Sequence, residues 1–286
     1  MVQKAPLIIQ MKTQKLVVLA TLLLLVCVND TSFAQSKFLK PKNGNTYVIA
    51  HRGVHNGIPE NTLAAYQKAI DLGCDFVEID VRTTKDNKFV SIHNSTIDAY
   101  VNGETGKVRD FTLKELLKLD IGLRIGKEWK NTRIPVFEEI LKLCQGKIGI
   151  YLDLKDADPI ALIKVIKKYE LEESIVWYLP ASAKMLLLDI KTNCSACLIM
   201  PDPGQEKNIK QVLEVYEPKF LASDMYNISN SYIEQAHENH IKVFVDDDED
   251  NPNKWQQEWQ TLIDMSVDGI QTDQPEALIS FIKSVN

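Results

Sequence analysis

The sequence predicts an α/β fold, a (β/α)8 TIM barrel with an antiparallel β-hairpin inserted after its second strand. From residue 47 onward, short apolar runs alternate with amphipathic helical stretches, as in the repeated βα units of a parallel sheet. Eight such units predict a closed barrel, and residues 35–286 have the usual length of one, about 250 residues. One further apolar run follows its predecessor too closely for a parallel crossover, which predicts the hairpin. The alternative is an open doubly wound sheet, but no glycine-rich phosphate turn follows any predicted strand.

The individual elements follow from apolar periodicity along the chain. Strands are expected at Tyr47–His51, Phe76–Val81, Phe89–His93, Ile148–Leu154, Ile175–Leu179, Ala196–Met200, Phe220–Ala222, Val243–Val245 and Gly269–Gln271. Helices with one apolar face are expected at Asn61–Leu72, Phe137–Leu143, Pro159–Tyr169, Ala183–Lys191, Ile209–Val215, Ser231–Asn239 and Trp255–Met265. Asn61 or Thr62 can cap the first helix, and Asp158-Pro159 is typical of a helix start.

The inserted hairpin joins the second and third expected strands through a short polar turn. Asp86 and Asn87 tolerate the positive φ of a two-residue turn, so we place them at its tip. In the resulting register, Asp80 lies opposite His93. Because strand side chains alternate between two faces, a shift of one residue would send His93 to the other face.

The first 34 residues are predicted to be a secretory signal peptide. A basic residue, Lys12, precedes an apolar run, Leu16–Val28, and small residues up to Ala34 indicate cleavage after that position. The run is shorter than the roughly 20 residues of a spanning helix, so no stable membrane insertion is expected after cleavage. We therefore expect an exported protein, periplasmic or secreted, whose single domain is residues 35–286. A lipid anchor at Cys27 is not favoured, because a bulky residue precedes it.

Charge and cysteine usage limit the classes of partner and site. Residues 35–286 carry 30 Lys and Arg against 38 Asp and Glu, a formal net charge of −8. This balance disfavours nucleic acid and anionic membranes as partners. Cys194 and Cys197 have the spacing of a redox or metal pair, but no second such pair exists in the sequence. Buried thiols or one local disulfide are therefore expected.

Polar side chains follow several predicted strands at their C-terminal ends, where the catalytic residues of such barrels lie. These residues are His51, Arg52, Glu78, Asp80, His93, Asp153 and Lys155. Clustered carboxylates repel one another unless a cation holds them, and an all-oxygen ligand set suits Mg²⁺ or Ca²⁺. Arg52 and Lys155 suit a phosphate, and the two histidines suit a general acid and a general base. Together they predict cleavage of a phosphodiester, although each residue alone is more often structural.

Six segments resemble the glycerophosphodiester phosphodiesterase family. They are "AHRG" (50–53), "PENTLAAYQKAIDLGCDFVEIDV" (59–81), "TKDNKFVSIHN" (84–94), "NGETGKVRDFTLKELLKLDIG" (102–122), "IPVFEEIL" (134–141) and "DGIQTDQPEAL" (268–278). The resemblance implies a (β/α)8 barrel that uses a divalent cation to hydrolyse glycerophosphodiesters to glycerol 3-phosphate and an alcohol. By position it implies metal ligands at Glu78, Asp80 and Asp153, an acid/base pair at His51 and His93, and phosphate binding by Arg52 and Lys155.

One further residue matches the family pattern, and three positions depart from it. Glu60 in "PENT" is expected to help cap a helix and also to support the metal site. Asn94 stands where the family usually has an acidic residue after its second histidine, and Asp153 where it usually has Glu. Asp246 begins a run of five acids where the family often has Trp-Thr-Val-Asn. We expect this run to be a solvated loop, with contact of Asp246 to a cationic head group or to the metal as the alternative.

These departures keep other functions open. The first is a related phosphodiesterase or phospholipase D-like enzyme that acts on lysophospholipids or inositol phosphodiesters. The second is a non-catalytic phosphodiester-binding homologue, which the retention of all seven charged and histidine site residues argues against. Trp177 and Tyr178 near another strand end can supply a substitute for the missing aromatic wall.

Overall fold

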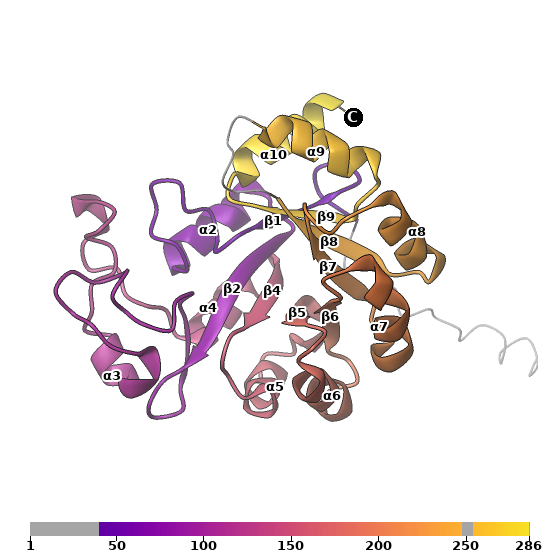
Figure 1. The fold of residues 1–286 in the computed structure, drawn as a ribbon. Coiled ribbons are helices and arrows are strands. Elements are labelled where there is room, and N and C mark those ends of the chain that lie inside the picture. The colour runs from indigo at the N-terminus through magenta and orange to yellow at the C-terminus, as the bar shows by residue number, and fades with distance from the viewer. Residues whose placement is uncertain (1–39, 248–253, 286) are drawn as a thin grey trace, which may run out of the picture. The chain divides into compact units, whose positions relative to one another are not determined.

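The computed structural model describes residues 40–247 and 254–285 and confirms the barrel. Its parallel strands alternate with helices (Figure 1) and are β1 (Tyr47–Ala50), β2 (Phe76–Thr83), β4 (Gly149–Leu154), β5 (Ile175–Pro180), β6 (Leu198–Asp202), β7 (Phe220–Asp224), β8 (Lys242–Asp246) and β9 (Gly269–Thr272). The helices between them are α2 (Leu63–Leu72), α4 (Phe137–Cys144), α5 (Pro159–Lys167), α6 (Lys184–Asn193), α7 (Ile209–Tyr216), α8 (Asn230–Glu238), α9 (Trp255–Asp264) and α10 (Pro275–Val285). The predicted signal peptide, with Cys27, lies outside the described residues.

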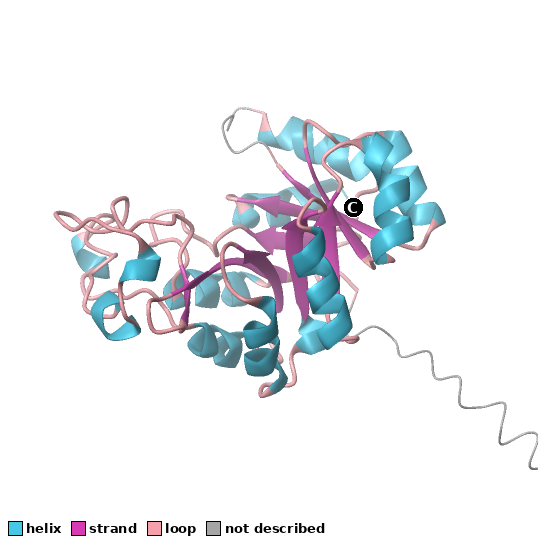
Figure 2. Ribbon diagram, turned by 60° about the horizontal axis from the view of Figure 1, so that its bottom comes forward, coloured by secondary structure: helices cyan, strands magenta, loops and turns pink. Residues whose placement is uncertain are grey.

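The strands form one nearly closed barrel with the helices packed outside it (Figure 2). Neighbouring strands follow the order β6-β5-β4-β2-β1-β9-β8-β7. Within the described residues no ladder joins β6 to β7, but these two strands lie side by side. The C-terminal ends of all eight strands therefore meet at one rim, where the predicted site residues converge.

Helix ends follow the capping signals in the sequence. The Thr62 side chain accepts a hydrogen bond from the Ala65 N–H at the start of α2, and Asp158 caps α5 with Pro159 in its first turn. The last helix, α10, was not predicted, and its buried face packs on the outside of the barrel. None of the helices in the described ranges is long and apolar enough to cross a membrane.

Aromatic side chains fill the interior of the barrel. Tyr47, Phe76 and Phe244 pack together with ring centroids 5.3, 5.6 and 5.8 Å apart. Gly149 and Gly269 leave room for two of the rings, because a Cβ there would lie 2.5 Å from the Phe76 ring and 2.6 Å from the Phe244 ring. This layer fills the barrel below its C-terminal rim. Since alternate strand residues face inward, the next inward positions belong to the site.

The hairpin is present, but its predicted register is wrong by one residue. β3 (Phe89–Ser91) pairs antiparallel with β2, and Thr83 lies opposite Phe89. The turn contains three residues, 85–87, because Asn87 adopts the left-handed conformation with φ 55° and lengthens the loop. A sequence with Asp and Asn side by side suits either loop length, which explains the error.

His93 nevertheless reaches the predicted site. The Ile92 N–H, and not that of His93, donates to the Asp80 carbonyl at 3.1 Å. Because β3 has already ended, strand alternation no longer decides which way His93 points. The Arg82 guanidinium donates two hydrogen bonds to the His93 carbonyl, at 2.6 and 2.9 Å, and holds this segment against β2.

Residues 94–136 form a lobe beside the hairpin, at the left of Figure 1, and include α3 (Leu113–Leu116). The apolar core of the lobe is shared with Val90 and Ile92 of the hairpin, and its other members are Ile97, Tyr100, Val108, Leu116, Ile121 and Ile134. The Arg124 guanidinium lies 4.8 Å from the centre of the Tyr100 ring. The lobe carries both side chains to the edge of the predicted site.

Candidate active site

The predicted site residues line one cavity of about 290 Å³ at the C-terminal rim of the barrel. Its lining residues are His51, Arg52, Glu78, His93, Tyr151, Asp153, Lys155, Tyr178, Asp202, Ser223, Asp224, Asp246 and Gln271. Asp80 adjoins them through an ion pair with Lys155, whose Nζ lies 3.0 Å from Asp80 Oδ1. All seven residues expected to perform the chemistry therefore come together.

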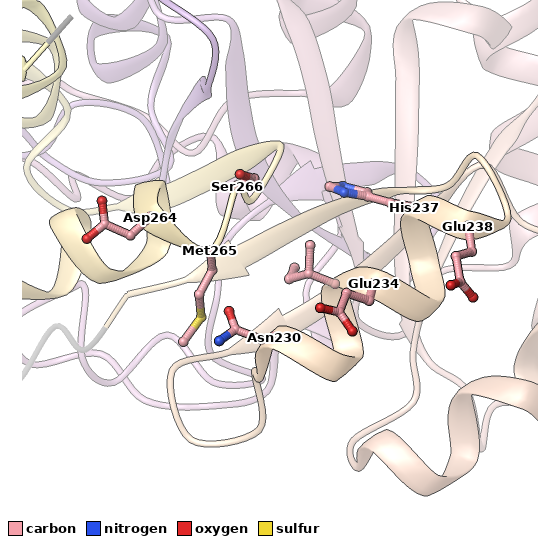
Figure 3. Close-up of a pocket in the computed structure, with 8 residues that line it drawn as sticks. Asn230, Glu234, His237, Glu238, Asp264, Met265 and Ser266 are labelled. Carbon is pink, nitrogen blue, oxygen red and sulfur yellow. The ribbon is translucent and has the colours of Figure 1, made fainter.

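A second cavity, between α8 and the end of α9, contains none of the predicted residues (Figure 3). Figure 3 shows His237 and Glu238 on α8 and Asp264 on α9, on the outside of the barrel. His237 Nε2 lies 2.9 Å from Asp268 Oδ2 in a hydrogen bond at the surface. We therefore place the candidate active site in the rim cavity.

The "HRG" segment bends sharply at the end of β1. Arg52 adopts φ 51°, an uncommon conformation for a side chain of this size, and its N–H donates to Glu78 Oε2 at 2.7 Å. Gly53 has φ 79°, and a Cβ there would lie 2.8 Å from the Ala65 backbone. Glycine is therefore required at this position, and the bend turns both His51 and Arg52 into the cavity.

Three carboxylates form the acidic centre of the site. One oxygen each of Glu78, Asp80 and Asp153 lies within 4.8 Å of the others. Burial and then the nearby Asp80 charge raise the pKa of Glu78 well above its usual value. Burial also raises the pKa of Asp153, although Lys155 opposes this. A cluster of buried carboxylate oxygens without sulfur fits a hard divalent cation.

Lys155 bridges two of the carboxylates. Its Nζ lies 2.6 Å from Asp153 Oδ2 and 3.0 Å from Asp80 Oδ1. Burial tends to raise the pKa of Asp80, but the charges of Lys155 and His93 outweigh it, so the pKa is lowered. The two carboxylates likewise raise the pKa of Lys155 against the effect of burial. Lys155 therefore keeps its positive charge, as its predicted role in phosphate binding requires.

Asn61 orients Asp80, a role that the sequence did not predict. Its Nδ2 donates to Asp80 Oδ2 at 2.7 Å, and its Oδ1 accepts from the hydroxyls of Tyr66 and Ser91, both at 2.8 Å. Asn61 is 1% exposed and has φ 52°. The predicted capping role falls to Thr62, which frees Asn61 to hold the carboxylate.

His51 is held by a carboxylate that the sequence analysis also missed. His51 Nδ1 lies 2.8 Å from Asp273 Oδ1, and His55 Nε2 lies 3.3 Å from the same oxygen. His55 Nδ1 faces the carbonyls of His51 and Gly53, at 3.0 and 3.2 Å. Both nitrogens of His55 face acceptors. Burial lowers the pKa of His55, but the hydrogen bond and the charge of Asp273 outweigh burial, so the pKa is raised. Asp273 directly follows β9, but the strand was expected to end at Gln271, two residues before it.

Comparisons with known proteins show which family the chain resembles. The pattern of the Glycerophosphoryl diester phosphodiesterase family matches residues 51–177. A glycerophosphodiester phosphodiesterase from Caldanaerobacter subterraneus subsp. tengcongensis is 34% identical over 257 residues, which are 83% of this chain and 98% of that protein. This chain belongs to the glycerophosphodiester phosphodiesterase family.

Solved structures of the family share the fold. A glycerophosphodiester phosphodiesterase from Agrobacterium tumefaciens superimposes with a TM-score of 0.72 at 22% identity, covering 82% of this chain and 99% of that one. A phosphodiesterase from Oleispira antarctica, solved with the product sn-glycerol-3-phosphate, gives a TM-score of 0.74 at 22% identity and covers 82% of this chain and 96% of that one.

Asn94, which stands where an acidic residue was expected, contacts the histidine that precedes it. Its Oδ1 lies 2.9 Å from His93 Nδ1. The Asn94 N–H donates to the Tyr100 hydroxyl at 3.2 Å, and this hydroxyl donates to Glu60 Oε1 at 3.2 Å. Glu60 in turn lies 3.4 Å from Arg52 Nη1. Glu60 therefore contacts a cationic residue of the site and not the three carboxylates.

The missing aromatic wall of the family is replaced only in part. Tyr178 lines the cavity, whereas Trp177 is fully buried in the outer layer of the barrel, so its predicted role is wrong. Adjacent strand residues point to opposite faces, and only one of the two can face inward. Asp246 lines the cavity, while Asp247 is buried and accepts a hydrogen bond from Trp259 Nε1 at 2.8 Å. The rest of the acidic run, and with it the predicted solvated loop, lies outside the described residues.

The four cysteines of the described residues lie outside this cavity. Cys194 and Cys197 form a disulfide between α6 and β6, one of the two expected outcomes. Cys74 and Cys144 are buried free thiols, and burial raises the pKa of each to about 12. Thiols of such high pKa are inert at neutral pH.

Proposed function

We propose that this protein hydrolyses glycerophosphodiesters to glycerol 3-phosphate and an alcohol, with a divalent cation, Mg²⁺ or Ca²⁺, as cofactor. The observation that carries the proposal is the convergence of two histidines, two cationic side chains and three carboxylates on one cavity. Family membership supports it. Arg52 and Lys155 hold the phosphate, while Glu78, Asp80 and Asp153 would hold the cation, which would supply Lewis-acid chemistry at the phosphate.

The two histidines act as acid and base through Nε2. Each is bonded through Nδ1 to a side-chain oxygen, of Asp273 for His51 and of Asn94 for His93. These bonds place the Nδ1 proton and orient both rings. The Asp273 carboxylate stabilises a positive charge on His51, whereas Asn94 offers His93 only a neutral amide oxygen. We therefore assign His51 as the general acid and His93 as the general base.

The first chemical step forms a cyclic phosphate. His93 takes the proton of the glycerol 2-hydroxyl, whose oxygen forms a bond to phosphorus. The bond between phosphorus and the alcohol oxygen breaks, and His51 gives its proton to that oxygen. In the second step water opens the ring, with the two histidines in exchanged roles. Glu60 supports Arg52 in its place beside the phosphate.

Release of glycerol 3-phosphate from a panel of glycerophosphodiesters and lysophospholipids, with and without each cation, tests the proposal. We expect turnover of the small diesters in Mg²⁺ or Ca²⁺. Preferred cleavage of lysophospholipids would support the alternative lipid substrate instead. If no diester is cleaved under any condition, the protein is not a phosphodiesterase of this kind.

Asp273→Asn is expected to lower kcat by about 10²-fold with little change in KM, because an imidazolium on His51 loses the charge that stabilises it. Since His51 then gives up its proton more readily, the alkaline limb of the pH profile moves to lower pH. Steady-state kinetics between pH 5 and 10 measure both effects. The matched control is Asp268→Asn, which removes the carboxylate bonded to His237 on the outer surface. An unchanged profile in Asp273→Asn would show that Asp273 is only structural.

We also propose that the enzyme is exported, on the strength of the sequence of residues 1–34. An extracellular or periplasmic location suits the disulfide between Cys194 and Cys197.

A further inference from the structure

We infer that His55 is a positioning residue of this enzyme, which holds Asp273 against the ring of His51 and shares the charge of that carboxylate. The inference rests on the proposed function, in which His51 is the general acid. The proposed reaction makes no use of His55, although this half-buried histidine lies beside the site. Its contacts connect it to the general acid.

His55 contacts the surroundings of His51 at two points. Its Nε2 lies 3.3 Å from Asp273 Oδ1, the oxygen that His51 Nδ1 contacts at 2.8 Å. Its Nδ1 lies 3.0 Å from the His51 carbonyl oxygen and 3.2 Å from that of Gly53. The His55 imidazole therefore connects the backbone of His51 to the carboxylate that orients the His51 ring. The two rings stand at 77° with their centroids 6.3 Å apart, so they are linked through the shared oxygen and do not stack.

Asp273 depends on the two histidines for its orientation. It lies between β9 and α10, and its side chain is 25% exposed. Within the described parts of the chain, the hydrogen-bonding and ionic partners of this side chain are His51 and His55. Rotamers of a partly exposed side chain exchange rapidly unless partners fix them. Loss of His55 would therefore leave the carboxylate, and with it the His51 ring, less well placed.

The charged form of His55 satisfies these contacts. A neutral imidazole has one N–H, whereas both nitrogens of His55 face oxygens that accept hydrogen bonds. Although burial lowers the pKa of His55, Asp273 raises this pKa by more. The titratable groups that act on His55 are Asp273, after β9, and His51, at the end of β1. A positive charge on His55 opposes a second one on His51, so His51 gives up its proton more readily than it would beside Asp273 alone.

His55 acts through Asp273 and not on the substrate. The residues that line the rim cavity include His51 but not His55. A purely structural role is the alternative, in which the bonds to the two backbone carbonyls only brace the bend of the "HRG" segment. Two substitutions separate these roles, because asparagine can place an amide nitrogen where histidine has Nδ1, and glutamine can place one where histidine has Nε2.

His55→Asn keeps a donor for the backbone carbonyls and removes the contact to Asp273. We expect kcat to fall by about tenfold, the lower end of the effect of a hydrogen bond to a charged group, with KM changed by less than about twofold. In the Asp273→Asn background the same substitution should have little further effect, because the carboxylate through which His55 acts is already gone. Release of glycerol 3-phosphate from a glycerophosphodiester measures kcat and KM for the unmodified enzyme, both single variants and the double variant.

His55→Gln keeps a donor for Asp273 and removes the positive charge. We expect it to recover most of the kcat that His55→Asn loses. The alkaline limb of its pH profile should move to higher pH, because the charge of Asp273 then acts on His51 unopposed and favours its protonated form. This shift is opposite to the one expected for Asp273→Asn, and a merely structural role for His55 would not produce it.

The control is His240→Asn. His240 is exposed between α8 and β8 and has φ 59°, a conformation that asparagine also adopts, so this variant should keep the parental kcat and pH profile. A parental kcat in His55→Asn, or a loss of the same size in the Asp273→Asn background, would overturn the inference. So would an unmoved alkaline limb in His55→Gln, which decides the case if the thermal midpoint shows that His55→Asn does not fold. Absence of turnover in the unmodified enzyme would instead overturn the proposed function.

Discussion

Replacing either His51 or His93 with alanine is expected to lower kcat for a glycerophosphodiester by about 10³-fold, within the range that one acid or base contributes. Both side chains line the cavity, and each is oriented by a bond to Nδ1. Because both histidines act in the same chemical step, the kcat of the double variant should be little lower than that of the less active single variant. Release of glycerol 3-phosphate gives kcat and KM, and the thermal midpoint shows whether the barrel is intact.

The control for this prediction is His237→Ala. His237 is bonded to Asp268 at 2.9 Å, much as His51 is bonded to Asp273 at 2.8 Å, but it lies on the outside of the barrel. His51→Ala and His237→Ala thus each remove one histidine–carboxylate contact, but only His51 lies in the rim cavity. Turnover within a few-fold of the unmodified enzyme in His51→Ala or His93→Ala would refute the acid/base assignment. A similar loss in His237→Ala would point to a defect of folding.

The fold was predictable because the barrel depends on local periodicity. The apolar runs and helical faces repeat along the chain, and each strand lies within two residues of its expected bounds. The predicted hairpin register was wrong because apolar periodicity does not determine it. It depends on the left-handed conformation of one residue, Asn87, which two loop lengths can accommodate equally well. The position of His93 survived the error because it lies beyond the strand.

The residues missed at the site were missed for two physical reasons. Asp202 and Asp224 fell just beyond strands that were expected to stop at Met200 and Ala222, and strand ends cannot be read closely from apolar patterns. Asp273 depends on a contact with His51 that spans 222 residues of sequence. Such a contact follows only from closure of the barrel, which brings β9 beside β1. The site residues within β2 and β4 were found because strand alternation alone places them together.

Removal of the divalent cation is expected to abolish turnover and to lower the thermal midpoint of the enzyme. Buried carboxylates of Glu78, Asp80 and Asp153 repel one another without it, and Lys155 balances only part of their charge. A ligand at 100 times its dissociation constant stabilises the folded state by about 2.7 kcal/mol, which corresponds to roughly 5–10 °C for a domain of this size. Scanning calorimetry and activity, before and after EDTA and with added Mg²⁺ or Ca²⁺, measure both effects.

Glu78→Gln separates a metal effect from a general effect of chelator on stability. The glutamine can still accept the hydrogen bond that the Arg52 N–H donates to Glu78 Oε2 at 2.7 Å, so the bend of β1 is retained. Because one of three repelling charges is gone, the metal-free variant should melt above the metal-free parent. Because a ligand is gone, added Mg²⁺ or Ca²⁺ should no longer raise its midpoint or its kcat. If EDTA changes neither turnover nor midpoint in the parent, the three carboxylates do not hold a catalytic cation.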